Sequence, residues 1–239
     1  MKKKYILYGA SFNPPHMGHF SAVRQLLEEF DKVIVFPYPH KHDNGTIEHI
    51  VPIKKRLKML ELFLAEFFPQ IQDRLMLVNL SEELKQKDKK NEGFLHTYDY
   101  LKYVQSKINT QDTELYVCLG IDAQKSIEEN SFYKEQEIKA EFKVFYLTEE
   151  KKITSPEIRN FLSTKKIIKS KKDESAIVQY LGYHVSKYVI SKGLYGLVNK
   201  KVEYNNKQIK VTHNQEATPI EAQDLEDSNI LSKNNKLKI

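Results

Sequence analysis

The sequence has few of the residues that mark secreted or membrane proteins, with one cysteine in 239 residues and no long apolar run. The single cysteine, Cys118, cannot form an internal disulfide, so nothing points to an oxidising compartment. No stretch approaches the roughly 20 apolar residues of a membrane-spanning helix. The apolar stretch behind the basic start at residues 1–4 is too short for a secretory signal. We therefore expect a cytoplasmic protein with no membrane partner.

Acidic residues are fewer than basic ones, because 32 aspartates and glutamates face 38 lysines and arginines and leave a net charge of +6. A mildly basic surface favours ligands that carry phosphate, although lysines that keep the surface solvated explain the same excess. No aromatic residue interrupts the lysine cluster at residues 165–172, and the segment near the C-terminus carries several acidic residues. We therefore expect no nucleic-acid partner.

Short apolar runs alternate with longer amphipathic ones over most of the chain. The expected strands are residues 5–8, 33–36, 75–78, 115–119 and 143–147. The expected helices between them are residues 20–30, 53–68, 97–108 and 122–129. This alternation predicts an α/β fold, a Rossmann-like doubly wound parallel sheet with helices on both faces. The ligand crevice of such a sheet lies at the carboxyl ends of its strands, where Gly9 and Gly120 each directly follow an expected strand.

The last third of the chain changes character. Residues 154–162 and 174–190 have the pattern of helices, joined by a basic linker at residues 165–172, and predict a small C-terminal helical part. Residues 198–239 are rich in asparagine, lysine, glutamine and glutamate and poor in apolar residues. We therefore expect a nucleotide-binding domain at residues 1–197 and a polar tail or small appendage at residues 198–239.

The run from Gly9 to His19 is the most informative part of the sequence. A strand, a loop of small residues and then a helix expose backbone N–H groups and a helix N-terminus to an anion. His16 and His19 add ring donors at the same place, which suits a phosphate whose charge changes during a reaction and indicates nucleotidyl transfer. A pair of turn histidines and a metal pair are the alternatives, but a zinc site would need further ligands such as cysteine.

This run resembles the signature of the HxGH nucleotidyltransferases, and residues 12–16 are most similar to the nicotinate (nicotinamide) mononucleotide adenylyltransferases. The resemblance covers about residues 3–197. Further matches follow in order at residues 39–41, Arg56 within residues 55–60, Thr97 with Asp99, residues 120–122, the second signature at residues 153–159, and residues 189–195.

The resemblance implies a role for each matching site residue. It implies catalytic roles for His16, His19, Arg159 and Lys41. For ATP and its phosphates it implies Gly9, Ala10, Ser11, Phe12, Gly18, Gly120, Asp122, Thr154 and Ser155. For the mononucleotide it implies Asn13, Arg56, Thr97, Phe132 and Tyr133. No protein ligand for a metal is implied.

The residues of the second signature also indicate a structure without the resemblance. Thr154 with Glu157 forms a capping box, Ser155 is an alternative cap, and Pro156 suits the first helical position, so a helix begins here. Arg159 in its first turns could neutralise phosphate, or it is a surface charge. The family usually has a hydroxyl residue at the position of Pro156, so one phosphate contact is in doubt.

Three further candidates each have a structural alternative. Family members often place a tryptophan over the pyridine ring, and this chain has none. Phe132 and Tyr133 could stack there instead, or they are core residues of a short helix. Lys41 could reach the leaving pyrophosphate, or it is a solvated loop charge. Asp122 could contact the nucleotide, cap the helix that follows, or do both.

The resemblance implies a magnesium-dependent adenylyltransferase of NAD biosynthesis. ATP and nicotinate mononucleotide would give the deamido-NAD dinucleotide and pyrophosphate by direct in-line displacement. Mg²⁺ is implied by the triphosphate chemistry and needs few protein ligands, because it keeps its waters. Nicotinamide mononucleotide, or another small phosphate as in phosphopantetheine adenylation or cytidylyl transfer, stays an alternative substrate. A catalytically silent nucleotide-binding regulatory module and a homo-oligomer also stay open.

Overall fold

The computed structural model describes residues 2–38, 51–79, 97–108, 112–120, 129, 134–148, 154–165, 168 and 170–198. Within these residues five parallel strands form one sheet in the order β3-β2-β1-β4-β5. The strands are β1 (Lys3–Ala10), β2 (Lys32–Pro37), β3 (Leu75–Leu77), β4 (Thr113–Leu119) and β5 (Lys143–Tyr146). The strand order reverses between β1 and β4, so the crevice at their carboxyl ends is the expected ligand site.

All five predicted strands are confirmed, with β1 extending further than predicted. Gly9 lies inside β1 opposite Phe36 of β2, whereas it was expected directly after the strand. A Cβ atom at Gly9 would lie 2.6 Å from the Tyr38 ring and 2.7 Å from the Phe36 ring. The two aromatic rings cover the end of β1, and only glycine leaves room for them. Gly120 does follow its strand, β4, directly.

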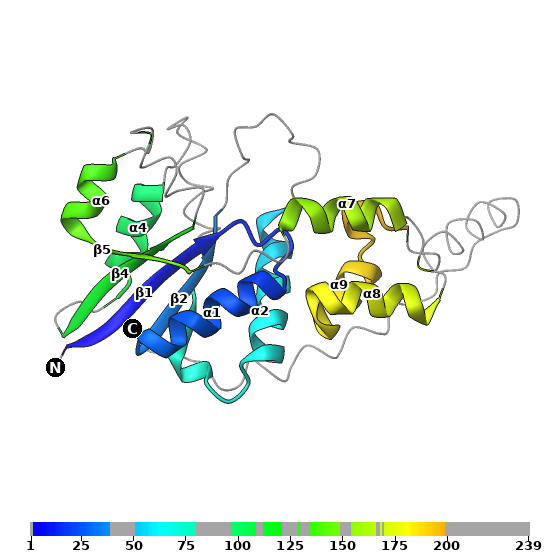
Figure 1. Ribbon diagram of the computed structural model, residues 1–239, viewed down its shortest axis with the longest axis horizontal. Helices are drawn as coiled ribbons and strands as arrows, with labels where there is room; N and C mark the ends of the chain where they lie inside the picture. Colours follow the sequence, from blue (N-terminus) through cyan, green and yellow to red (C-terminus); the bar gives the residue numbers. More distant parts are fainter. Residues whose placement is uncertain are drawn as a thin grey trace, which may run out of the picture. The chain divides into compact units, whose positions relative to one another are not determined.

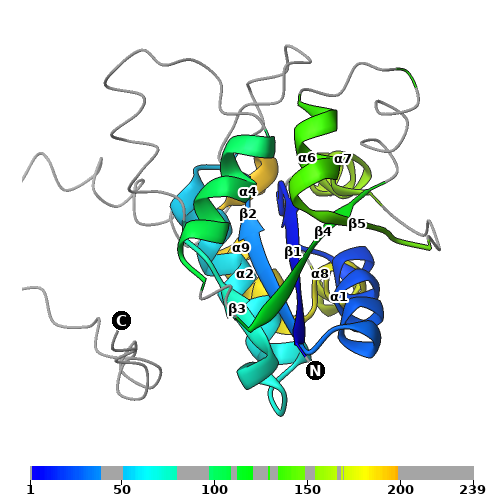
Figure 2. The same ribbon diagram turned by 90° about the vertical axis from the view of Figure 1, so that its left-hand side faces the viewer.

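Helices cover both faces of the sheet, as predicted. The helices α1 (Met17–Glu29) and α2 (Ile53–Phe67) pack with Ile6 and Tyr8 of β1. The helices α4 (Thr97–Ser106) and α6 (Glu135–Glu141) pack with Leu7, which points to the opposite face because side chains alternate along a strand. Figures 1 and 2 both show α1 and α4 on opposite sides of β1. The predicted helix at residues 122–129 lies outside the described residues except for residue 129, and α6 was not predicted.

The C-terminal helical part consists of α7 (Ser155–Lys165), α8 (Lys171–Leu181), α9 (Tyr183–Ser191) and a 3-10 turn, η3 (Leu194–Gly196), gathered beside α1 and α2 (Figure 1). The single helix predicted at residues 174–190 is wrong, because Gly182 has a φ of +78° and separates α8 from α9. The Glu66 carboxylate of α2 accepts hydrogen bonds from the backbone N–H groups of Tyr183 (2.7 Å) and His184 (2.8 Å). An acidic side chain from another helix therefore caps α9.

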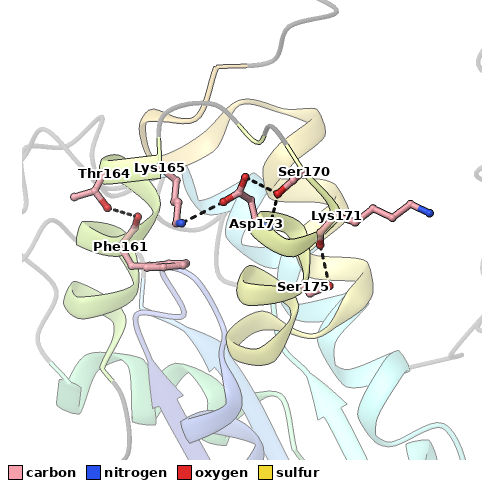
Figure 3. A network of polar contacts seen from close by, with 7 residues as sticks. All are labelled: Phe161, Thr164, Lys165, Ser170, Lys171, Asp173 and Ser175. Atoms are coloured by element: carbon pink, nitrogen blue, oxygen red, sulfur yellow. Dashed lines mark hydrogen bonds and ion pairs between the residues drawn. The ribbon is translucent and has the colours of Figure 1, made fainter.

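The predicted basic linker is partly helical, because α8 already begins at Lys171. Ser170 caps it by accepting a hydrogen bond from the Asp173 N–H group (3.2 Å), and its hydroxyl donates to the Asp173 carboxylate (3.0 Å). Lys165, at the end of α7, donates to the same carboxylate at 3.2 Å. Figure 3 shows the three side chains pointing toward one another between the two helices. These contacts hold the end of α7 against the start of α8.

Residues 199–239 lie outside the described residues, so the predicted polar tail and the domain boundary at residue 198 stay predictions.

No helix within the described ranges is both long enough and apolar enough to cross a membrane.

Candidate active site

The loop of residues 11–16, which we call the signature loop, joins the carboxyl end of β1 to the start of α1. It lies at the point where the strand order reverses. Phe12 has a φ of 44°, an uncommon value for a residue with a side chain, and its ring is fully buried. The ring packs against the His19 ring, with the two centroids 4.6 Å apart. The Phe12 side chain therefore belongs to the core and supports the His19 ring.

His16 and His19 cap α1 reciprocally, which gives a structural reason for their spacing of three. His16 is the residue before the first helical turn, and its Nδ1 atom accepts a hydrogen bond from the Gly18 N–H group at 3.1 Å. The His19 Nδ1 atom accepts one from the His16 N–H group, also at 3.1 Å. This is a capping box built from two imidazoles. The ring centroids lie 3.9 Å apart.

These backbone contacts determine which ring nitrogen carries the proton. Because each Nδ1 atom accepts a hydrogen bond, the proton of each neutral ring is on Nε2. Burial lowers the pKa of His16 to about 4, with the Glu157 carboxylate acting weakly in the opposite direction. Burial and the neighbouring His16 lower the pKa of His19 well below its usual value. Within the described residues neither Nε2 has a protein partner, so at neutral pH both rings are uncharged and each keeps one N–H donor that the protein does not use.

The low pKa of His16 predicts a loss of stability in acid. The folded protein resists protonation of His16, whereas the unfolded chain protonates near pH 6.5. The His16 contribution is therefore fully present above pH 6.5 and is lost as the pH falls toward 4. We expect this residue to lower the free energy of unfolding by about 3 kcal/mol between pH 7 and pH 4.

Urea unfolding followed by circular dichroism at both pH values measures this loss. His16→Asn is the matched control, because asparagine is a good N-cap residue and does not titrate. The wild type should lose about 3 kcal/mol more than this variant on acidification. Equal losses in the two proteins would show that His16 is not held neutral.

The second signature lies against the first. The guanidinium group of Arg159 in α7 donates from Nη1 to the main-chain oxygen of Asn13 at 2.8 Å. The Ser155 hydroxyl donates to the main-chain oxygen of Pro14 at 3.3 Å. Two segments that are more than 140 residues apart therefore form one site, with the N-terminus of α7 beside the signature loop.

The predicted capping box at the start of α7 is confirmed. The Glu157 carboxylate accepts hydrogen bonds from the N–H group and the hydroxyl of Thr154, both at 2.7 Å. The helix begins at Ser155, so Thr154 is the cap and Pro156 is the second helical residue, whereas it was expected at the first. The hydroxyl protons of Thr154 and Ser155 are both used within the protein, so neither simply replaces the hydroxyl that Pro156 lacks.

Arg56, which the resemblance assigns to the mononucleotide, is a brace between three backbone segments. Its side chain is only 1% exposed. It donates to the carbonyl oxygens of Val51 (2.9 Å), Ser11 (2.6 Å) and Tyr38 (2.6 Å). Burial lowers the pKa of Arg56 to about 10, so it stays charged at neutral pH. The contacts tie the signature loop to the end of β2 and to the chain entering α2.

The other predicted site residues fall into two groups. Thr97 starts α4, and its side chain is hydrogen-bonded to the buried Tyr38 hydroxyl. Gly120 is exposed directly after β4, and nothing lies within 4 Å of the position of a Cβ atom there. The residues that lie outside the described residues are Lys41, Asp122, Phe132 and Tyr133.

Metal ligation by the two histidines finds no support in the part of the chain that the structure describes. There, no three histidine, cysteine, aspartate or glutamate side chains are grouped so that they could hold an ion. Both Nδ1 atoms accept backbone hydrogen bonds, which leaves one nitrogen per ring. The donors of this site suit phosphate oxygens, because N–H groups bind anions and not cations.

Comparisons with known proteins agree with this geometry. The cytidylyltransferase-like family model matches residues 7–170. A Fusobacterium nucleatum protein named "Probable nicotinate-nucleotide adenylyltransferase" is 31% identical over 212 residues, which cover 84% of this chain and 95% of that protein. A solved Vibrio parahaemolyticus structure covers 82% of this chain and 97% of its own at 24% identity, with a TM-score of 0.59.

The structure of Plasmodium falciparum nicotinic acid mononucleotide adenylyltransferase, a complex with NaAD, shares the fold with a TM-score of 0.58. It is 19% identical and covers 82% of this chain and 98% of its own. The family model and the Fusobacterium relative both span most of the domain that carries the two signatures. The chain therefore belongs to the nicotinate-nucleotide adenylyltransferases within the cytidylyltransferase-like family.

Proposed function

We propose that this protein is an adenylyltransferase of NAD biosynthesis that joins ATP and nicotinate mononucleotide into deamido-NAD and releases pyrophosphate. The observation that carries the proposal is the pair of neutral imidazoles at the N-terminus of α1, each with its proton on Nε2. The name of the Fusobacterium relative and the NaAD complex of the Plasmodium enzyme support the same substrate.

The chemistry is a displacement at the α-phosphorus of ATP. An oxygen of the mononucleotide 5′-phosphate forms a bond to this phosphorus, and the bond from the phosphorus to the bridging oxygen of pyrophosphate breaks. Negative charge builds on the equatorial oxygens in the transition state, where hydrogen-bond donors act most strongly. His16 and His19 would donate there from Nε2. Neither ring acts as a base, because the lone pair of each Nδ1 atom is engaged by the backbone.

A direct displacement fits the residues better than a covalent intermediate. Cys118, the single cysteine, is only 3% exposed, and burial raises its pKa to about 12, so it is not a nucleophile at neutral pH. Alignment of the two phosphates would supply roughly 7–11 kcal/mol. Each donor at the developing charge would add roughly 2.7–4 kcal/mol. Fast displacement would therefore depend mainly on rigid placement of the signature loop.

The leaving pyrophosphate would meet Arg159 and the N-terminus of α7. Arg159 is half-buried, and burial lowers its pKa, so the guanidinium group is poorly solvated and gains from an anionic partner. One of its nitrogens already bonds the Asn13 oxygen, which sets its direction. Lys41 is proposed for the same anion. The main chain at Gly9, Ala10, Ser11 and Gly120 is proposed for ATP, whereas the Gly18 N–H group already donates to the His16 ring.

Mg²⁺ would arrive bound to the triphosphate. The site that the structure describes offers nitrogen donors and no carboxylate cluster, which fits a metal held by phosphate oxygens and water and not by the protein. Mg²⁺ held in this way would neutralise charge on the phosphate oxygens. The chain's own part is to align the substrates and donate hydrogen bonds.

Pyrophosphate release with different acceptors tests the proposal. Purified protein is incubated with ATP and Mg²⁺ and, separately, nicotinate mononucleotide, nicotinamide mononucleotide, phosphopantetheine and phosphocholine, the last with CTP. Turnover is expected to be fastest with nicotinate mononucleotide. Faster turnover with another acceptor would replace the substrate, and ATP binding without turnover in every arm would favour a regulatory module.

A further inference from the structure

The last described turn of the chain reaches back to the signature loop. Tyr195, in η3, donates a hydrogen bond from its hydroxyl to the Asn13 Oδ1 atom at 2.9 Å. Both side chains are buried, and the two residues are 182 positions apart in the sequence. Residues 189–195 match the terminal helix of the family, but that match assigns no role to Tyr195.

Asn13 is the residue of the signature loop to which several distant segments of the chain are hydrogen-bonded. Its Oδ1 atom also accepts from the Val51 N–H group at 3.3 Å. Its main-chain oxygen accepts from Arg159 at 2.8 Å. His16 follows three residues later and caps α1. A rotation of the chain at Asn13 would therefore move both imidazoles.

Tyr195 is itself held in an unusual conformation. Its φ is +58°, and glycines with positive φ flank it at Gly193 (58°) and Gly196 (83°). A residue with a side chain keeps such a φ only where its surroundings impose it. Gly196 lies against Ser163 of α7, where a Cβ atom would be 3.5 Å from the Ser163 Cα atom. Burial raises the pKa of the Tyr195 phenol, so the hydroxyl stays protonated and remains a donor.

We infer that Tyr195 is a positioning residue, whose hydrogen bond to Asn13 holds the signature loop so that His16 and His19 face the α-phosphate. The effect on turnover rests on the proposed function, whereas the effect on the loop does not. The η3 turn would thus act on the site through Asn13.

Tyr195→Phe tests the inference, because it removes one hydroxyl and keeps the ring. Removing the shorter of the two hydrogen bonds to the buried Asn13 Oδ1 atom should lower kcat about tenfold. The KM for ATP should change by less than about threefold, because the lost alignment matters most in the transition state. The His16 and Gly18 amides, which donate to the two imidazoles, should exchange their hydrogens faster.

Tyr188→Phe is the matched control, since Tyr188 is a half-buried tyrosine of α9 that makes no hydrogen bond to the signature loop within the described ranges. It should leave kcat and the exchange of both amides unchanged. The Tyr195→Phe and Asn13→Ala variants should show non-additive effects on kcat when combined, because both remove the same hydrogen bond.

Each outcome decides the inference. Unchanged exchange of the His16 and Gly18 amides in Tyr195→Phe would overturn it, whatever the activity. Faster exchange with an unchanged kcat would overturn it as well and leave Tyr195 a purely structural residue. If the wild type has no activity with any acceptor, the proposed function fails, and the exchange measurement still decides whether Tyr195 holds the loop.

Discussion

The His19→Ala variant is expected to lower kcat by about 10²–10³ with a smaller change in KM. The His19 ring is buried, neutral and oriented by the His16 N–H group, so its Nε2–H group is a preorganised donor. Such a donor acts mainly on charge that develops in the transition state, and its loss therefore lowers turnover more than substrate binding. Steady-state kinetics with ATP and nicotinate mononucleotide measure both constants.

Two conservative variants separate the two roles of His19, the helix cap made by Nδ1 and the hydrogen-bond donor at Nε2. In His19→Asn the amide oxygen lies near the position of Nδ1 and can still accept from His16, but nothing replaces Nε2. In His19→Gln the amide reaches the position of Nε2, while the cap is lost. We expect the asparagine variant to keep its stability and lose turnover, and the glutamine variant to lose stability and keep turnover. Wild-type kcat in His19→Asn would remove this residue from the chemistry.

The Arg56→Ala variant is expected to lower the free energy of unfolding by about 3–5 kcal/mol, because three carbonyl oxygens lose their donor at once. This is large against the total stability of most domains. Arg56→Lys keeps the charge but offers one flexible ammonium in place of a planar fork, so an intermediate loss is expected. Urea unfolding followed by circular dichroism measures both.

Arg24→Ala is the control for the Arg56 variants. Arg24 is exposed on α1, and its replacement should change the free energy of unfolding by less than about 0.5 kcal/mol. A loss below about 1 kcal/mol in Arg56→Ala would contradict the role of Arg56 as a brace. Arg56 would then be better explained by direct contact with a ligand.

The two histidines show why a structural and a functional interpretation of one motif need not compete. The sequence from Gly9 to His19 is compatible with phosphate binding and with a pair of turn histidines. In the structure the rings are turn residues, because their Nδ1 atoms build the cap of α1. The same contacts place the protons on Nε2 and keep both rings neutral. Local capping therefore prepares the donors that the proposed chemistry uses.

The sheet and its flanking helices could be predicted because the signal for each is local. Short apolar runs such as residues 33–36 favour strands buried on both faces, and spacings of three and four mark α2 as amphipathic. The break at Gly182 could not be seen in this way. It depends on Glu66, more than 100 residues away, whose carboxylate caps α9.

The structural roles of Arg56 and Asn13 could not be predicted for the same reason. Arg56 and Asn13 match positions of the family, and the resemblance assigned both to a substrate. Their partners, Ser11, Tyr38 and Tyr195, are distant in sequence, and three of the contacts use backbone or hydroxyl groups that no side-chain pattern reveals. Only the fold shows that these polar side chains are engaged by the protein.

Product analysis of a single reaction shows whether this protein makes a dinucleotide and whether His19 takes part. Purified protein is mixed with ATP, Mg²⁺ and nicotinate mononucleotide, and the products are separated, identified and quantified by mass spectrometry. The His19→Ala variant is treated in the same way. We expect deamido-NAD and pyrophosphate in equal amounts, with both strongly reduced in the variant. Release of ADP or AMP without a dinucleotide, or equal yields from the two proteins, would contradict it.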